Sequence, residues 1–185
     1  MSASTSALQQ KNAKHLIQSF SDLSYIKNPE STHIISRADG VYIYDNDGKK
    51  ILDSMSGLWC VNMGYGQQSI IEAVNEQMKE LVYYNNFFGS SHPSAIKLSE
   101  MIANKTPEGM NKVYFCGSGS EANDTVVRLA RHYWAARGNP SKSVIISRTN
   151  AYHGSTMAGA SLGGMSAMHA QGGLPIADIE HIDQP

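Results

Sequence analysis

Alternating apolar and polar positions in residues 41–53 predict a β-hairpin. The apolar-rich runs 41–44 and 50–53 flank a polar stretch, residues 45–49, that contains Asp47-Gly48. An Asp-Gly pair favours the tight turn that joins two antiparallel strands. A glycine-marked loop, residues 57–66, follows this hairpin.

Apolar residues at helical spacing predict two helices after this loop. Pro93 is expected to start the second helix, because proline at the first helical position loses no backbone hydrogen bond. The apolar faces comprise Ile70, Ile71, Val74, Met78, Leu81 and Val82 in the first helix, and Ile96, Leu98, Met101 and Ile102 in the second.

The second half of the chain predicts the order strand, helix, strand. Residues 113–116 and 144–146 are apolar runs, and apolar residues at helical spacing lie between them. Gly138-Asn139-Pro140 is expected to end this helix. The order implies a right-handed crossover in a parallel sheet, so the predicted fold class is α/β.

Composition and charge narrow the class of protein. The 185 residues are 41% hydrophobic and 17% charged, and the net charge is −1. This balance favours neither nucleic acid nor an acidic membrane surface, and no apolar run is long enough for a membrane span. Without a secretory signal, the expected location is cytoplasmic, with Cys60 and Cys116 as buried thiols. The seven histidines lack metal-ligand spacing, so no metal site is predicted.

The stretch Gly117-Ser118-Gly119-Ser120-Glu121 lies between the predicted strand and helix. A helix N-terminus offers free N–H groups and a positive dipole end, so this turn can bind a phosphate. Ser118 is then expected to cap the helix, while Ser120 keeps its hydroxyl for the anion. The alternative is a simple capping box formed by Ser118 and Glu121, without any ligand. Neither a Walker loop nor a dinucleotide fingerprint is present.

Tyr152-His153-Gly154 follows the strand at residues 144–146, so it is expected at the same carboxyl edge of the sheet as the 117–121 turn. A tyrosine ring there can stack on a flat heteroaromatic ring, although an ordinary surface loop also explains the tripeptide. Two further loops, Leu58-Trp59-Cys60 and residues 83–88, are rich in aromatic side chains. Their side chains are expected either to line a pocket or to pack in the core or at a subunit interface.

Taken together, these motifs resemble the class III aminotransferases, which use pyridoxal 5′-phosphate (PLP). The resemblance covers residues 20–185 and is greatest for the omega-amino acid or polyamine:pyruvate branch. It rests on the phrases Gly57-Leu58-Trp59-Cys60-Val61-Asn62, Gly64-Tyr65-Gly66, Ser118-Gly119-Ser120-Glu121-Ala122-Asn123-Asp124, Tyr152-His153-Gly154-Ser155-Thr156 and Ser161-Leu162-Gly163-Gly164-Met165.

The resemblance implies site residues and an architecture. The cofactor residues would be Ser118, Gly119, Ser120, Tyr152 and His153, with Gly119 and Ser120 on the phosphate and Tyr152 on the pyridine ring. The amine pocket would be lined by Trp59, Phe87, Phe88 and Phe20. The implied architecture is the amino-terminal part of a type I PLP-dependent transferase fold, with residues 1–56 in the small domain and residues 57–185 in an incomplete large domain. The family forms homodimers with active sites at the subunit interface.

The family's Schiff-base lysine, pyridine-pairing aspartate and carboxylate-binding arginine are expected beyond residue 185, so no catalytic residue is assigned. The implied reaction moves an amino group from an amine or omega-amino acid to a keto acid such as pyruvate, and the isolated chain is expected to be inactive. One alternative is a non-catalytic truncated remnant or a partner-dependent structural fragment. A second is a PLP aminomutase or decarboxylase relative, which the Leu58-Trp59-Cys60 phrase argues against by resemblance.

Overall fold

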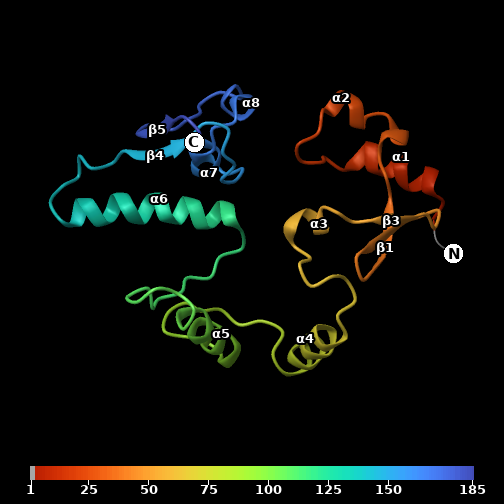
Figure 1. Ribbon diagram of the computed structural model, residues 1–185, viewed down its shortest axis with the longest axis horizontal. Coiled ribbons are helices and arrows are strands. Elements are labelled where there is room, and N and C mark those ends of the chain that lie inside the picture. The colour runs from red at the N-terminus through yellow and green to blue at the C-terminus, as the bar shows by residue number, and fades with distance from the viewer. Residues whose placement is uncertain (1–2) are drawn as a thin grey trace. The chain divides into compact units, whose positions relative to one another are not determined.

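A computed structural model describes residues 3–185, and this part of the chain divides after Ser91 into two compact units (Figure 1). The first two residues of the predicted segment 1–56 lie outside the described part of the chain. The predicted domain boundary after residue 56 concerns the domains of the whole family fold, and it stays a prediction. Each unit is described separately below.

The first unit combines short helices with a three-stranded antiparallel sheet of order β1-β2-β3. The predicted hairpin is confirmed, with Ile43 opposite Ile51 in the register of β2 and β3. Asp45 stabilises its turn, because its carboxylate accepts the N–H groups of Asp47 and Lys49. The elements are α1 (Thr5–His15), α2 (Leu23–Ile26), the 3₁₀ turn η1 (Pro29–Ser31), β1 (Ile35–Asp39), β2 (Tyr42–Asp45), β3 (Lys50–Leu52), α3 (Ser56–Trp59) and α4 (Gln68–Glu80).

The second unit contains a long helix and a parallel pair of strands, as the α/β pattern predicts. Pro93 occupies the first turn of its helix, which confirms the predicted start, and His92 caps that helix through its ring nitrogen. Strands β4 and β5 are parallel, with Ile145 opposite Ile179. The elements are α5 (Pro93–Ala103), α6 (Gly119–Ala136), β4 (Ile145–Arg148), α7 (Met157–Leu162), α8 (Ser166–His169) and β5 (Ile179–Ile182).

The strand predicted at residues 113–116 is wrong. No backbone group of this run pairs with another strand among residues 3–185, and the run forms no sheet element. An apolar run needs a neighbouring strand for its backbone N–H and C=O groups before it becomes part of a sheet. Strand β5 was not anticipated from the sequence, and it supplies the parallel partner of β4 instead.

The core of the second unit lies between α6, α7 and the two strands (Figure 1). Val127, Leu162 and Ile179 are buried there, with Ile145 packed against them. The apolar faces of α4 and α5 are largely exposed, and their side chains include Ile70, Val74, Met78, Ile96 and Met101, each 50–59% accessible. Among residues 3–185, no helix is both long enough and apolar enough to cross a bilayer.

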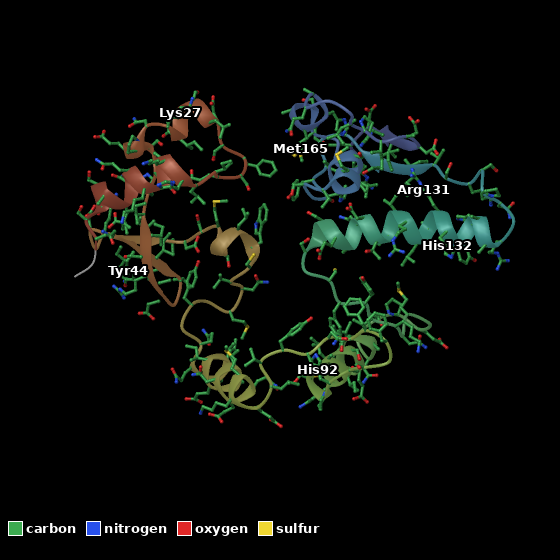
Figure 2. All side chains as sticks on the ribbon, turned by 180° about the vertical axis from the view of Figure 1, so that it is seen from behind. Lys27, Tyr44, His92, Arg131, His132 and Met165 are labelled. Carbon is green, nitrogen blue, oxygen red and sulfur yellow. The ribbon has the colours of Figure 1, made fainter. Side chains whose placement is uncertain are left out.

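Arg131 joins the middle of α6 to the starts of both strands. Its Nε donates to the carbonyl of Ser143 at 3.0 Å, just before β4. One of its terminal nitrogens donates to the carbonyls of Ala177 at 2.7 Å and Asp178 at 3.4 Å, just before β5. Figure 2 shows Arg131 on the side of α6 that faces β4, whereas His132 points away from it. The planar guanidinium therefore fixes the helix to the sheet.

Candidate functional site

Ser118, the first of the predicted cofactor residues, caps α6. Its backbone is extended, with φ −160° and ψ 163°, and its Oγ accepts the N–H of Glu121 at 3.1 Å. The carbonyl of Ser118 accepts the N–H of Ala122 at 3.0 Å and so begins the helical hydrogen bonds. A side-chain acceptor at this position satisfies one of the donors that every helix start leaves open. The predicted capping role of Ser118 is therefore confirmed.

The next two residues, Gly119 and Ser120, present free donors. Neither of their N–H groups has a hydrogen-bond acceptor among residues 3–185. A Cβ added to Gly119 would meet nothing within 4 Å, so the space beside it is open. The Glu121 carboxylate accepts the N–H of Gly117 at 2.5 Å. The turn therefore offers two N–H groups at the positive end of an 18-residue helix.

The loop of residues 152–156 lies against this turn. The N–H of Ser155 donates to Oγ of Ser120 at 3.1 Å, and Nδ2 of Asn123 donates to the carbonyl of His153 at 2.6 Å. Gly154 is buried, and a Cβ added there would lie 2.6 Å from Oγ and 2.9 Å from Cα of Ser120. The two predicted cofactor segments are thus brought together in one unit.

The Ser120 hydroxyl is not entirely free, which corrects one detail expected from the sequence. Its oxygen accepts the N–H of Ser155, and the side chain is half-buried between α6 and the 152–156 loop. A hydroxyl that accepts one hydrogen bond keeps its hydrogen for donation. Ser120 therefore retains a donor, but its direction is constrained by the loop.

Asp124 ties the same loop to α6 from the following turn. Its Oδ1 accepts hydrogen bonds from Oγ1 of Thr156 at 2.7 Å and from the N–H of Gly159 at 3.1 Å. Thr156 also caps α7, because its Oγ1 accepts the N–H of Gly159 at 3.3 Å. The side chains of Tyr152 and His153 are exposed on the loop that these bonds hold.

The sequence pattern assigned no role in the candidate site to Asn123, Asp124 or Thr156. All three lie inside phrases that carried the family resemblance, and Thr156 also stands three residues before Gly159 in a helix-capping position. The cap was recognisable from sequence, because threonine is a common N-cap residue. The hydrogen bond from Thr156 to Asp124, 32 residues away, could not be recognised from the sequence.

The four aromatic residues predicted for the amine pocket belong to the first unit, residues 1–91, whereas the cofactor residues belong to the second. All four side chains are exposed: Phe20 is 68% accessible, Trp59 80%, Phe87 64% and Phe88 104%. The rings of Phe87 and Phe88 have centroids 6.0 Å apart. Their predicted contact with an amine stays a prediction.

Trp59 ends an unusual backbone segment. The φ angles are 51° at Ser56, 58° at Gly57, 67° at Leu58 and 61° at Trp59, so α3 is a turn of left-handed helix. The N–H of Trp59 donates to the carbonyl of Met55 at 2.8 Å, which closes the turn. Residues other than glycine avoid this region at a cost of about 1–2 kcal/mol each. Such strain persists only where surrounding structure imposes it.

Asp53 contacts this turn directly. Its Oδ2 accepts the O–H of Tyr65 and the N–H of Gly57, both at 2.8 Å. The bond from Tyr65 is the main reason that the pKa of the Asp53 carboxyl lies below its ordinary value of 3.8. The same bond raises the pKa of the Tyr65 hydroxyl above its ordinary value of 10.0. The carboxylate and the neutral phenol are therefore paired near neutral pH.

Neither thiol is buried, contrary to expectation, because Cys60 follows the exposed left-handed turn and Cys116 lies in the unpaired run before α6. Within the described chain, no group of three or more histidine, cysteine or acidic side chains could bind a metal ion. The candidate site therefore consists of the 117–121 turn and the 152–156 loop.

Comparison with known proteins assigns the family. Residues 25–185 match the model of the family "Aminotransferase class-III". The chain is 53% identical over 183 residues to the putrescine–pyruvate aminotransferase of Pseudomonas aeruginosa, a match that covers 99% of this chain and 40% of that protein. The chain thus spans about two fifths of the length of this relative.

Solved structures agree with this match. The omega transaminase of Pseudomonas jessenii in complex with PMP, the aminated form of PLP, has a TM-score of 0.92 and 36% identity, covering 96% of this chain and 39% of that one. A thermostable omega transaminase engineered for asymmetric synthesis of enantiopure bulky amines, with a tryptophan replaced by glycine, gives the same values. The fold is thus a mixed α/β part of the PLP transaminase fold, and the chain belongs to the class III aminotransferases.

Proposed function

We propose that this chain is the amino-terminal part of a PLP-dependent omega transaminase that moves an amino group from a diamine or omega-amino acid to a keto acid such as pyruvate. The observation that carries the proposal is the pair of open N–H groups of Gly119 and Ser120, with the 152–156 loop packed beside them. The name of the Pseudomonas aeruginosa relative supports the choice of a diamine and pyruvate as substrates.

The turn has the chemistry that a phosphate ester requires. Two N–H donors and one hydroxyl belong to the first turn of the helix, where the dipole favours negative charge. Gly119 leaves open space in which a phosphate oxygen could approach the backbone. The nearest acidic residue of the first turn, Glu121, directs its carboxylate to the N–H of Gly117. The residues present therefore fit the phosphate of PLP.

The residues of this chain would bind and orient the cofactor rather than react. Gly119 and Ser120 would donate hydrogen bonds to the phosphate, while Ser118 keeps the helix start formed. Tyr152 would cover one face of the pyridine ring, and Asn123 would hold the loop through the carbonyl of His153. When bound, PLP supplies the electron sink for the amino-group transfer. No catalytic group is assigned to this chain.

The amine side of the proposal rests on Trp59. The chain has two tryptophans, and the other, Trp134, is half-buried on α6 against the ring of Tyr133 at 5.3 Å. A tryptophan-to-glycine change in a relative accompanies engineering for bulky amines. This supports Trp59 as a residue that limits the size of the amine.

An amide NMR titration tests cofactor binding. The ¹⁵N-labelled chain is titrated with PLP, inorganic phosphate and pyridoxal, which lacks the phosphate. We expect PLP and phosphate to shift the amide signals of Gly119 and Ser120, and pyridoxal to leave them in place. If PLP leaves both signals unchanged while pyridoxal and PLP shift the same distant residues, the phosphate assignment is wrong.

A second measurement tests the reaction. A polypeptide that also supplies the Schiff-base lysine of the family is assayed for alanine formed from pyruvate and a diamine. Absence of alanine from such a protein, with PLP bound, would contradict the proposed substrates. The homodimer and the cytoplasmic location stay predictions, which the mass of the purified protein and its subcellular fractionation can test.

A further inference from the structure

The left-handed turn at residues 56–59 is not explained by its own sequence. Glycine is the only residue type that visits this conformation routinely, and only Gly57 among the four is a glycine. The turn also contains Leu58 and the exposed Trp59, whose large side chains disfavour the left-handed backbone conformation. Contacts from outside the turn must therefore hold its backbone.

These contacts come from two residues that are both anchored to the three-stranded sheet. Asp53 follows β3, and its N–H donates to the carbonyl of Val41 at 3.0 Å. Tyr65 exchanges two backbone hydrogen bonds with Gly40, of 2.7 and 3.2 Å. The Asp53 carboxylate then accepts both the Tyr65 hydroxyl and the N–H of Gly57. The sheet is thus connected to the turn through one carboxylate.

Packing restricts the turn at the same point. A Cβ added to Gly57 would lie 2.7 Å from Cγ2 of Val61 and 3.1 Å from the hydroxyl oxygen of Tyr65. A larger residue at position 57 would therefore require Val61 or the hydroxyl that bonds Asp53 to move. The N–H of Gly57 faces the carboxylate, so hydrogen bonding and packing select the same backbone.

We propose that Asp53 and Tyr65 are positioning residues, which hold residues 56–59 in the left-handed turn and so set the direction in which Trp59 meets the amine. The inference rests on the proposed function, in which Trp59 contacts the substrate. Without the two hydrogen bonds, the turn relaxes to ordinary backbone angles, and the Cα–Cβ bond of Trp59 points elsewhere.

Backbone relaxation NMR on the ligand-free chain tests whether Asp53 and Tyr65 hold the left-handed turn. In the wild type, we expect order parameters of about 0.85 for the amides of Leu58 and Trp59, as in rigid backbone. Tyr65→Phe keeps the ring and removes the hydroxyl, and Asp53→Ala removes the carboxylate oxygen that accepts both hydrogen bonds. Each is expected to lower these order parameters below about 0.6, the range of flexible segments. Asp53→Asn, which keeps an acceptor oxygen, is expected to give an intermediate value.

Tyr42→Phe is the matched control, because it removes a tyrosine hydroxyl from β2 in the same unit without touching Asp53. It should leave the order parameters and the positive-φ chemical shifts of residues 56–59 unchanged. If Tyr65→Phe and Asp53→Ala also leave them unchanged, the two residues do not hold the turn. Should Asp53→Ala fail to fold, Tyr65→Phe decides the outcome alone.

A selectivity assay tests the link to the substrate. In the active enzyme that carries this stretch, Tyr65→Phe is expected to change the ratio of kcat/KM for a bulky aryl amine to that for a diamine about tenfold. Tyr42→Phe should leave the ratio unaltered. An unaltered ratio in Tyr65→Phe, with a loosened turn, overturns the role of the turn in amine recognition. If the wild type converts no amine at all, the proposed function fails. The relaxation data alone then decide whether Asp53 and Tyr65 hold the left-handed turn.

Discussion

Oγ1 of Thr156 donates a 2.7 Å hydrogen bond to Oδ1 of Asp124, which lies 32 residues earlier in the chain. Thr156 caps α7, and Asp124 lies in the first turns of α6, so one carboxylate connects the starts of two helices. The 152–156 loop enters α7 at this point. Its position over the 117–121 turn therefore depends on Asp124.

Replacing Asp124 should loosen that loop. Asp124→Ala removes the acceptor of two hydrogen bonds, and we expect the free energy of unfolding to fall by about 1–3 kcal/mol. Asp124→Asn keeps one acceptor oxygen and should cost less. Urea denaturation measures the loss, and amide hydrogen exchange at Gly159 locates it. The control Glu180→Ala, on the exposed side of β5, should change neither; equal effects in both variants would contradict the assignment.

Three substitutions of Ser118 should separate helix capping from anion binding. Asparagine and aspartate cap helices as well as serine does, whereas Ser118→Ala should cost about 1 kcal/mol of stability. Ser118→Asp adds a negative charge beside the proposed phosphate position, so it should keep stability and lose phosphate affinity. Ser118→Asn should keep both.

Thermal unfolding and the amide titration with phosphate measure these two properties. If Ser118→Asp binds phosphate as tightly as Ser118→Asn at low ionic strength, no anion binds near this helix start.

Gly154→Ala should disrupt the contact between the loop and α6. The backbone there has φ +128°, and the new Cβ would lie 2.6 Å from Oγ of Ser120. Gly172→Ala is the control, because Gly172 has φ +88° with nothing within 4 Å of an added Cβ. Both variants bear the cost of a positive φ, but only Gly154→Ala adds overpacking, worth about 1–3 kcal/mol. Equal losses of stability in urea denaturation would show that the close approach is absent.

The Asp53–Tyr65 pair predicts a pH dependence of the left-handed turn. The pKa of Asp53 is lowered in the folded protein, chiefly by the Tyr65 hydroxyl. The contribution of Asp53 to the stability of the turn is therefore complete above the ordinary pKa of 3.8. It disappears as pH falls through the lower, folded pKa. The pKa of Tyr65 is raised, so its contribution is complete below 10.0 and is lost as pH rises through the folded value.

Amide chemical shifts of residues 57–59, followed from pH 2 to 11, measure this window. Tyr65→Phe should move the acidic transition to higher pH, because the Asp53 carboxyl loses its main stabilising hydrogen bond, and should abolish the alkaline transition, because phenylalanine does not titrate. If the acidic transition in Tyr65→Phe occurs at the same pH as in the wild type, the hydroxyl does not bond the carboxylate.

Local sequence patterns predicted the elements whose signals are local. The Asp-Gly pair in residues 45–49 marked the hairpin, Pro93 marked the start of α5, and the Ser-x-x-Glu pattern marked the cap of α6. These features depend on residues within one or two turns of each other. Turn and cap chemistry therefore suffices to find them.

Features that depend on distant partners could not be predicted in the same way. Residues 113–116 are apolar enough for a strand, yet pairing depends on a neighbour, and β4 instead pairs with β5. The left-handed turn runs against the preferences of Leu58 and Trp59, because Asp53 and Tyr65 impose it. Likewise, the motif located Ser120 and Tyr152 in sequence, whereas the bond from Ser155 that constrains Ser120 required the fold.

Arg131 gives α6 a fixed point far from its capped end. The guanidinium holds the helix to both strand starts, about three turns from Ser120. A small tilt at that fixed point is magnified along a stiff rod into a larger displacement at the far end. If the Gly119–Ser120 turn binds the PLP phosphate as proposed, its affinity depends in part on Arg131, which lies far from it. Directed-evolution libraries for tighter PLP retention therefore have a reason to include position 131.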